Sequence, residues 1–218
     1  MSATRSQLLD TAERLFLENG LDGVSLRTIV REAGQKNQSA LQYHFGGRDG
    51  LLQAILDRRL LQVEETRQAL LDEALTRQQN PDLREICALM ARGPFLLCRE
   101  RQDFREFLGL FGQQLLGSEP TISFDHPNRD LPSLKVLQSL LKRTLSPVDP
   151  ELMALRVENA QSLVLLVLSR RARLGGSFRG RRAELFFNNL IDQVAAMLAG
   201  PVSDATRSLL NDAPGDSR

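Results

Sequence analysis

Two short helices joined by a tight turn are predicted between residues 25 and 52, and this pattern constrains the fold more than any other feature of the chain. Ser25 can cap the first helix, whose apolar residues recur at helical spacing up to Ala33. Gly34 can end that helix and open the turn, and the second helix is predicted over about residues 38–44. Two helices in this arrangement form a helix-turn-helix, in which the second helix can enter the major groove of DNA.

A further helix is predicted before this motif, over about residues 4–19. Thr4 and Gln7 have the spacing of a capping box, and Gly20 can end the helix. Its apolar stripe, which can share one centre with the two following helices, consists of Leu8, Ala12, Leu15 and Phe16. The sequence therefore predicts a three-helix domain over residues 1–52, which we call the head.

A long helix is predicted to connect the head to the rest of the chain. No glycine or proline occurs between Leu51 and Asn80. A single helix can therefore run from about Arg48 to about Leu75, and it would join the two parts as a rigid rod rather than as a flexible linker.

The remaining residues also have helical patterns. The helix that begins at Asn80-Pro81 should kink or break at Gly93-Pro94, because proline lacks the amide hydrogen that a helix interior needs. Further helices are expected at about residues 104–116, 134–145, 150–174 and 182–198, with one turn near 205–210. The predicted fold class is all-α, with the head at 1–52, a larger helical domain at 53–200 and a flexible tail at 201–218.

Charge and composition exclude some classes of protein. The formal net charge is +1, and the six bases of residues 1–52 are matched by six acids. DNA binding would therefore depend on where the charges lie rather than on their total. The longest purely aliphatic run, Leu163 to Leu168, is too short to cross a membrane, and the N-terminus has no apolar signal core. We expect a cytoplasmic protein without membrane contact.

No enzymatic or metal chemistry is indicated. Cys87 and Cys98 lack metal-ligand spacing, and eleven residues along one helix would hold them about 16 Å apart, too far for a disulfide. The two histidines, His44 and His126, belong to no catalytic or metal-binding motif. We expect no enzyme, no metal and no cofactor, and two buried thiols in a reducing compartment.

Residues 4–56 resemble the DNA-binding domain of the TetR family of bacterial transcriptional regulators. The resemblance is carried by the first helix from Leu8 to Gly20 and by four short segments: Val24–Ile29, Glu32–Gly34, Tyr43–Phe45 and Arg48–Leu52. One departure is clear. Ten residues separate Gly34 from Phe45, one more than the family usually has, so the turn is longer and the base-reading residues do not transfer directly.

The resemblance implies a ligand-responsive regulator, and in most cases a repressor. It implies a homodimer that binds a palindromic operator in double-stranded DNA through the head. It also implies a cavity for a small effector in the larger domain, and dimerisation through the last two long helices. The apolar character of that domain points to a hydrophobic effector.

The candidate DNA-binding residues lie in and around the helix-turn-helix. Gln42, Asn37 and Gln38 can pair with adenine, and Lys36 can reach guanine or phosphate. The residues suited to the DNA backbone or to the entrance of the motif are Ser25, Arg27, Thr28, Ser39, Tyr43, His44 and Arg48. The competing interpretation is that these side chains only solvate a surface helix, or that Tyr43 packs against the head.

The candidate ligand-binding residues lie in the larger domain. Phe104, Phe107 and Phe111 have the spacing of one helical face and could form the wall of an apolar pocket. Further candidates for that wall are Cys87, Met90, Phe95 and Asn159, the last on an apolar stripe between two leucines. Plain core packing is the alternative for the phenylalanines.

Two features near the C-terminus allow alternative interpretations. The last long helix has a broad apolar face that could form a four-helix dimer interface or belong to the monomer core: Phe186, Phe187, Leu190, Ile191, Val194 and Leu198, with Leu163, Leu166 and Val167 on the preceding helix. The basic residues at the junction, which a solvated loop or a phosphate contact would explain, are Arg170, Arg171, Arg173, Arg179, Arg181 and Arg182.

A function of a different class would use the same head. In this alternative the chain is a DNA-bound scaffold whose helical body binds another protein and no small molecule. A well-packed interior would favour the scaffold, and a cavity lined by Phe104, Phe107 and Phe111 would favour the ligand-responsive regulator.

Overall fold

The computed structural model describes residues 2–37, 39–78, 80–117, 131–145 and 147–211, and in these ranges it contains helices and no strand, which confirms the all-α prediction. The helices are α1 (Ala3–Asn19), α2 (Leu26–Glu32), α3 (Ser39–Phe45), α4 (Arg48–Arg77), α5 (Leu83–Glu100), α6 (Gln102–Gly117), α7 (Pro132–Thr144), α8 (Pro150–Arg173), α9 (Arg181–Ala199) and α10 (Asp204–Asn211). The predicted loop at 117–130 falls almost wholly outside the described residues, as does His126.

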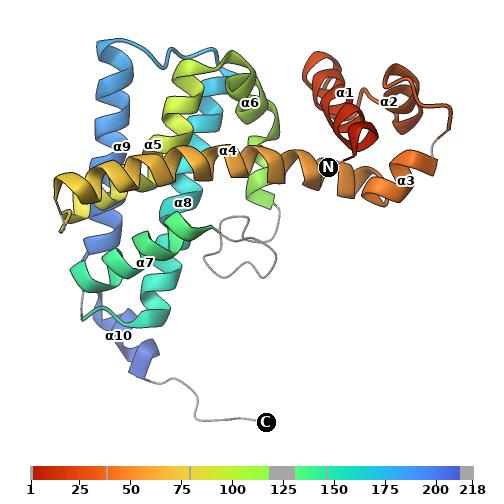
Figure 1. Ribbon diagram of the computed structural model, residues 1–218. Helices are drawn as coiled ribbons and strands as arrows, with labels where there is room; N and C mark the ends of the chain where they lie inside the picture. The colour runs from red at the N-terminus through yellow and green to blue at the C-terminus, as the bar shows by residue number, and fades with distance from the viewer. Residues whose placement is uncertain (1, 38, 79, 118–130, 146, 212–218) are drawn as a thin grey trace, which may run out of the picture.

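The head lies at one end of the molecule, where α1, α2 and α3 form a small unit beside the larger bundle (Figure 1). Ser25 caps α2 as predicted, since its side chain accepts a hydrogen bond from the amide of Thr28 at 3.0 Å. Helix α1 begins earlier than the sequence predicted: its cap is Ser2, which accepts from the amide of Arg5, and not the Thr4–Gln7 capping box. A cap needs only one suitable side chain, and the more N-terminal serine supplies it.

Helix α4 runs without interruption from the head into the bundle, which confirms the prediction of one long connecting helix. It has 30 residues and is therefore about 45 Å long. Its first turns pack against α1 and α3, and its later turns pack against α5 and α7. Any displacement of α4 in the bundle is therefore transmitted to the head by a rigid element.

Helix α5 continues through Gly93 and Pro94, so the expected break at this pair does not occur. Gly93 is buried where α5 crosses α4, and an added Cβ would lie 3.3 Å from the carbonyl oxygen of Val63. The glycine thus permits close packing of the two helices. Burial of apolar residues on both sides of Pro94 holds the helix together across the missing amide.

The larger bundle, which we call the body, packs α5, α6, α8 and α9 side by side (Figure 1). Helices α6 and α8 approach closely at Gly112, where the absence of a side chain makes room for Ser169. An added Cβ at Gly112 would collide with the side chain of Ser169. The apolar face of α9 lies inside this bundle and is not exposed: Phe187, Leu190, Ile191, Val194 and Leu198 are all buried. These five residues belong to the core of one chain, which favours the monomer-core alternative over the dimer interface for this face.

Helix α8 is the only helix among the described residues that is long and apolar enough to cross a membrane. One face of α8 packs against α6 and α9, which is how a core helix of a bundle behaves. Length and composition alone are weak evidence for a membrane span, and nothing in the packing of α8 supports one. Beyond α9, the short helix α10 occupies the region where one turn was expected.

Cys87 and Cys98 are both in α5, and both are free and buried, which confirms that they form no disulfide with each other. Burial raises the pKa of each thiol to about 12. The thiols therefore stay protonated at neutral pH and act as small apolar side chains.

Candidate DNA-binding surface and internal cavity

The outer face of α3 carries the polar side chains that the sequence assigned to DNA. Leu41 and Phe45 are buried in the head, whereas Ser39, Gln42 and Tyr43 are exposed. Tyr43 is 86% exposed, so it does not pack against the head and the structural alternative for this residue is wrong. Its ring meets the ring of His44 edge-to-face, with centroids 5.1 Å apart. A large exposed aromatic ring beside an amide is suited to contact with another molecule.

The turn before α3 presents further polar groups. Lys36 and Asn37 are exposed, and the side-chain oxygen of Asn37 accepts a hydrogen bond from the amide of Ser39 at 3.0 Å. This hydrogen bond holds the Asn37 side chain against the start of α3, which limits its freedom to read a base. Gln38 lies outside the described residues. The side-chain amide nitrogen of Gln42 donates to the backbone carbonyl oxygen of Gly46, just after α3, at 3.2 Å.

The first turn of α2, at the start of the helix-turn-helix, carries further polar side chains. Arg27 is exposed there, and the hydroxyl groups of Ser25 and Thr28 are 2.9 Å apart and hydrogen-bonded to each other. These groups lie at a helix N-terminus, where backbone amides can also face an anion.

Arg48 points into the head. Its guanidinium donates to the carbonyl oxygens of Val24, at 2.8 Å, and Leu21, and it lies over the ring of Phe16, 5.2 Å from the centroid. The Arg48 side chain therefore holds the start of α4 against the loop between α1 and α2. It points away from the exposed face of α3.

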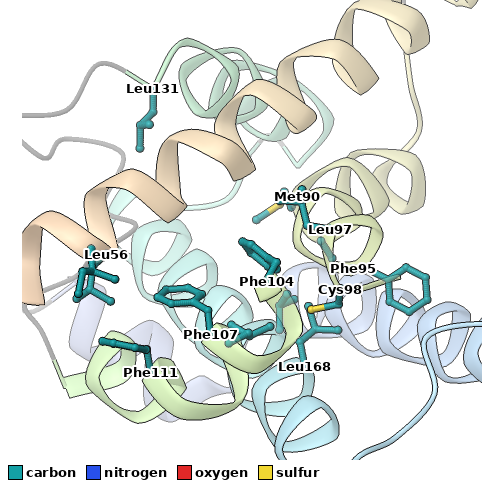
Figure 2. Close-up of a cluster of buried hydrophobic side chains, with 14 of the residues drawn as sticks. Leu56, Met90, Phe95, Leu97, Cys98, Phe104, Phe107, Phe111, Leu131 and Leu168 are labelled. Carbon is teal, nitrogen blue, oxygen red and sulfur yellow. The ribbon is translucent and has the colours of Figure 1, made fainter. Parts of the chain in front are cut away.

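The body contains a cavity of about 90 Å³ between α4, α5, α6, α7 and α8. Its walls are mostly apolar, and its lining residues are Leu56, Arg59, Leu60, Val63, Arg67, Met90, Pro94, Phe104, Phe107, Leu108, Leu134, Gln161, Val164, Leu165 and Leu168. Three of the predicted ligand-binding residues, Met90, Phe104 and Phe107, are among them. Figure 2 shows Phe104 and Phe107 side by side on α6, with Met90 projecting from α5.

The other four predicted ligand-binding residues do not line this cavity. Cys87 is buried elsewhere, and Phe95 packs against Phe187 with ring centroids 4.4 Å apart. Phe111 stacks on Phe107 at 5.0 Å and meets Phe16 of the head at 6.3 Å. Asn159 is exposed, so the expectation of a buried asparagine was wrong.

The sequence reasoning missed three polar residues of the cavity wall, Arg59, Arg67 and Gln161. A signal for the two arginines exists: Arg59, Val63 and Arg67 are four residues apart and share one face of α4. Gln161 carries no comparable signal, because a single glutamine in a helix is usually a surface residue.

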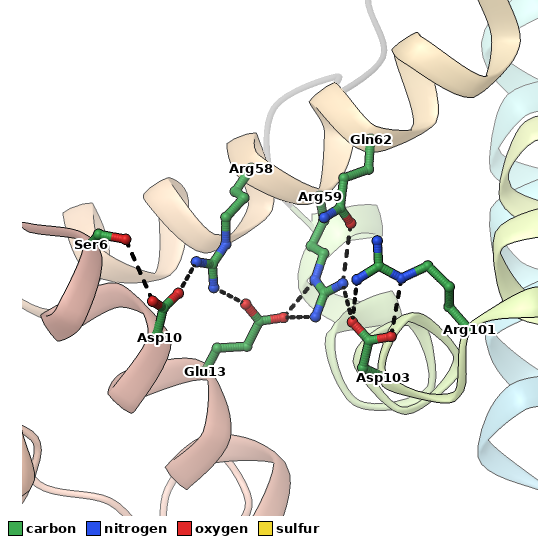
Figure 3. Close-up of polar contacts among 8 residues, drawn as sticks. All are labelled: Ser6, Asp10, Glu13, Arg58, Arg59, Gln62, Arg101 and Asp103. Carbon is green, nitrogen blue, oxygen red and sulfur yellow. Dashed lines mark hydrogen bonds and ion pairs between the residues drawn. The ribbon is translucent and has the colours of Figure 1, made fainter. Parts of the chain in front are cut away.

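Arg59 joins the cavity to the head through a buried ion network (Figure 3). Its guanidinium donates from Nε to Glu13 of α1 at 2.6 Å and from Nη1 to Asp103 of α6 at 2.8 Å. The same guanidinium lies 5.4 Å from the ring centroid of Phe107, on the cavity side. Glu13 and Arg59 are only 3% and 6% exposed. Arg58 completes the network by pairing with Glu13 and with Asp10.

The network fixes the charge state of its members. Partial burial opposes ionisation of Asp103, but hydrogen bonds from Arg101 and Arg59 outweigh it and lower the pKa of this carboxyl group to about 2. Burial works against the charge of Arg58 as well, yet its hydrogen bonds to Asp10 and Glu13 raise its pKa above the ordinary value. Asp103 and Arg58 are therefore charged at neutral pH.

Comparison with known proteins decides the family. Residues 8–55 match the family described as bacterial regulatory proteins, tetR family. The head, from α1 to the first turns of α4, therefore matches this family. A solved structure of a TetR-family transcriptional regulator from Pectobacterium atrosepticum is similar to it, with 22% sequence identity, coverage of 99% of this chain and 96% of that chain, and a TM-score of 0.48. A search of curated proteins found no match.

The family match identifies residues 8–55 as the DNA-binding part of a bacterial transcriptional regulator. The match spans α1 to the first turns of α4, which is the part of the molecule that presents the exposed face of α3. The body, with its cavity, lies outside the matched residues.

The basic residues at the junction of α8 and α9 are mostly solvated, as the simpler interpretation predicted. Arg170, Arg173 and Arg179 are exposed. Arg171 is half-buried because it lies over the ring of Phe186, 4.3 Å from the centroid, and donates to the carbonyl oxygen of Ser177 at 2.6 Å. This residue closes the turn between the two helices.

Proposed function

We propose that this tetR-family regulator is a ligand-released repressor in the cytoplasm. A homodimer binds a palindromic operator in double-stranded DNA, and a small apolar effector in the body cavity lowers that affinity. The observation that carries the proposal is the position of Arg59, which forms part of the cavity wall and also holds α1 of the head.

The exposed face of α3 supports its role as the recognition helix. Ser39, Gln42 and Tyr43 lie outward on it, and Lys36 lies in the turn before it. Gln42 can read adenine, whereas Lys36 and Tyr43 suit phosphate contacts. Two heads on a two-fold axis would read half-sites about 35 Å apart, one turn of the DNA helix.

Two parallel connections can transmit ligand binding to the head. The polar connection is Glu13–Arg59–Asp103. The apolar connection is a row of rings, from Phe104 and Phe107 in the cavity wall through Phe111 to Phe16 in α1. A ligand that moves Arg59 alters the polar connection between body and head, and one that moves Phe107 alters the apolar connection.

The small size of the cavity supports such movement. At about 90 Å³ it is smaller than the cavity of about 150 Å³ that accommodates benzene. We propose that a benzene-sized effector pushes the walls apart, and α4 is one of the walls. Because α4 is continuous with the head, its displacement changes the spacing of the two heads in a dimer.

Exposed apolar residues on α8 and α9 support dimerisation through these helices. Leu155 and Leu166 on α8 and Leu185 on α9 are at least half exposed. Asn159 lies on the exposed side of α8 between the first two leucines. We propose that this stripe, and not the buried face of α9, packs against a second copy of the chain.

The scaffold alternative and an enzymatic role receive less support. A cavity lined by Phe104 and Phe107 gives a small molecule a place to bind, which a pure scaffold would not need. Among the described residues no group of three or more histidine, cysteine or carboxylate side chains could hold a metal ion. We propose that the chain acts by binding and needs no cofactor.

The test is a titration of fluorescent operator DNA with the full chain, repeated with each member of a library of small apolar compounds. We expect at least one compound that lowers DNA affinity about 100-fold, which corresponds to about 2.7 kcal/mol of coupling. Compounds that bind the body and leave DNA affinity unchanged would refute the ligand-released repressor, whereas a library in which no compound binds the body would favour the scaffold.

A further inference from the structure

Among the described residues that line the cavity, Gln161 on α8 is the one with a buried polar atom that has no partner. Its side-chain nitrogen Nε2 is shielded from solvent, and it has no hydrogen-bond partner among the described residues. A buried amide donor is destabilising unless an acceptor faces it. The donor therefore indicates where a ligand oxygen would be stabilised.

The two arginines of the wall have their charges balanced inside the protein. Arg59 is paired with Glu13 and Asp103. Arg67 donates to Glu64 at 2.5 Å and to the hydroxyl of Ser133 at 2.6 Å.

The carboxylate of Glu64 is also fully engaged. It accepts hydrogen bonds from the amide of Ser133 at 2.8 Å and from the hydroxyl of Ser133 at 2.7 Å, in addition to its ion pair with Arg67. Every charge on the described wall thus has a partner of opposite sign. A charged ligand would have to be buried without a counter-ion or would have to break one of these pairs.

The rest of the wall is apolar. Leucine, valine, methionine, proline and phenylalanine side chains surround the space, and their burial favours a hydrocarbon body over a polar one. The wall therefore combines one unsatisfied donor, balanced charges and an apolar surface.

We propose that this cavity takes an uncharged, mainly apolar molecule with one hydrogen-bond acceptor, such as a ketone or ester oxygen, which accepts from Nε2 of Gln161. The inference rests on the proposed function in taking the cavity as the effector site, and it adds the chemical class of the effector and the residue that selects it.

The experiment uses two probes of nearly the same shape. Cyclopentanone carries a carbonyl oxygen where methylenecyclopentane carries a CH₂ group, and cyclopentanecarboxylate supplies a charged comparison. Each is titrated against the full chain, and its Kd is obtained from the rise in thermal unfolding temperature with ligand concentration. We expect the ketone to bind about three- to tenfold more tightly than the alkene, as one net hydrogen bond predicts, and the carboxylate to bind more weakly than both.

Two variants locate the effect. Gln161→Met keeps the length of the side chain and removes the amide, so it should abolish the preference for the ketone and retain alkene binding, which also shows that the cavity is intact. Gln68→Met is the matched control, because Gln68 lies on α4 outside the cavity and donates to Asp72 at 2.8 Å. It should keep the full preference for the ketone.

The possible failures are distinguishable. Equal binding of ketone and alkene, or a ketone preference that survives in Gln161→Met, overturns the role of Gln161 and leaves the cavity as an effector site. Tighter binding of the carboxylate overturns the uncharged class. Failure of every probe to bind overturns the inference, and a DNA titration of the same samples shows separately whether the chain still binds DNA.

Discussion

Glu13 of α1 links the head to the body through ion pairs with Arg58 and Arg59 of α4. Its carboxylate accepts from both Arg58 and Arg59, and it is almost completely buried. Removal of one partner from a buried ion pair is far more costly than its net contribution suggests, because the remaining charges lose their compensation. The stability of the head–body contact therefore depends strongly on this one carboxylate.

Replacement of Glu13 by Gln should destabilise the chain by about 3 kcal/mol, since both arginines lose a charged partner but each keeps another, Asp10 or Asp103. Urea unfolding followed by circular dichroism measures this change. The matched control is Glu18→Gln on the same helix, which breaks only an exposed pair with Arg14 and should cost less than about 0.5 kcal/mol. Equal effects of the two substitutions would contradict a special role for the buried network.

Two residues of the helix-turn-helix should differ in their effect on DNA. Gln42→Ala should relax base preference at one position in each half-site by about 1–3 kcal/mol, because an amide reads base edges. Lys36→Ala should weaken binding evenly across sequences and reduce the salt dependence by about one charge, because an ammonium contacts phosphate. Binding curves for an operator and its single-base variants at several salt concentrations check both. An unchanged base preference in Gln42→Ala would mean that α3 is not seated as proposed.

At the scale of elements, α4 depends on its first residue for its attachment to the head. Arg48→Met should destabilise the chain by about 2 kcal/mol, because the carbonyl groups of Val24 and Leu21 lose their donor. Arg31→Met, at an exposed position in the same domain, should stay within about 0.5 kcal/mol. Thermal unfolding of both variants is the measurement. A change of similar size in both would show that Arg48 has no special structural role.

Local signals made the helices predictable. Ser25 and Gly20 act within a few residues of the helix ends that they define, so their effects can be read from the sequence. The same locality limited the prediction for Gly93 and Pro94, since the packing that keeps α5 continuous comes from α4, far away in the sequence.

Which face of a helix is buried was harder to predict. A spacing of four residues drifts by about 40° per step around a helix. Leu155 is therefore exposed and Leu163 half-buried, and Asn159 between them lies on the exposed side. The pattern also shows that α9 has an apolar face but cannot say whether its own chain or a second copy covers it. The cavity is lined by residues from five separate helices. No local sequence pattern predicts that these helices pack around one space.

At the scale of the whole molecule, the proposed dimer uses the exposed leucines of α8 and α9. Leu166→Arg and Leu185→Arg should each give monomers and weaken operator binding, because a buried guanidinium without a partner opposes association. Leu61→Arg on α4, where the leucine is also more than half exposed, should leave the dimer intact. Sedimentation equilibrium measures the masses. Dimers in all three variants would place the interface elsewhere.

The proposed two-fold dimer reads a palindromic operator with α3. This can be tested by selection of random duplex DNA with the purified, folded chain at low salt, followed by sequencing of the retained DNA. We expect one enriched palindrome, with half-sites whose centres lie about 10 base pairs apart, one turn of the DNA helix. Enrichment of a single non-palindromic site, or of no motif at all, would contradict it.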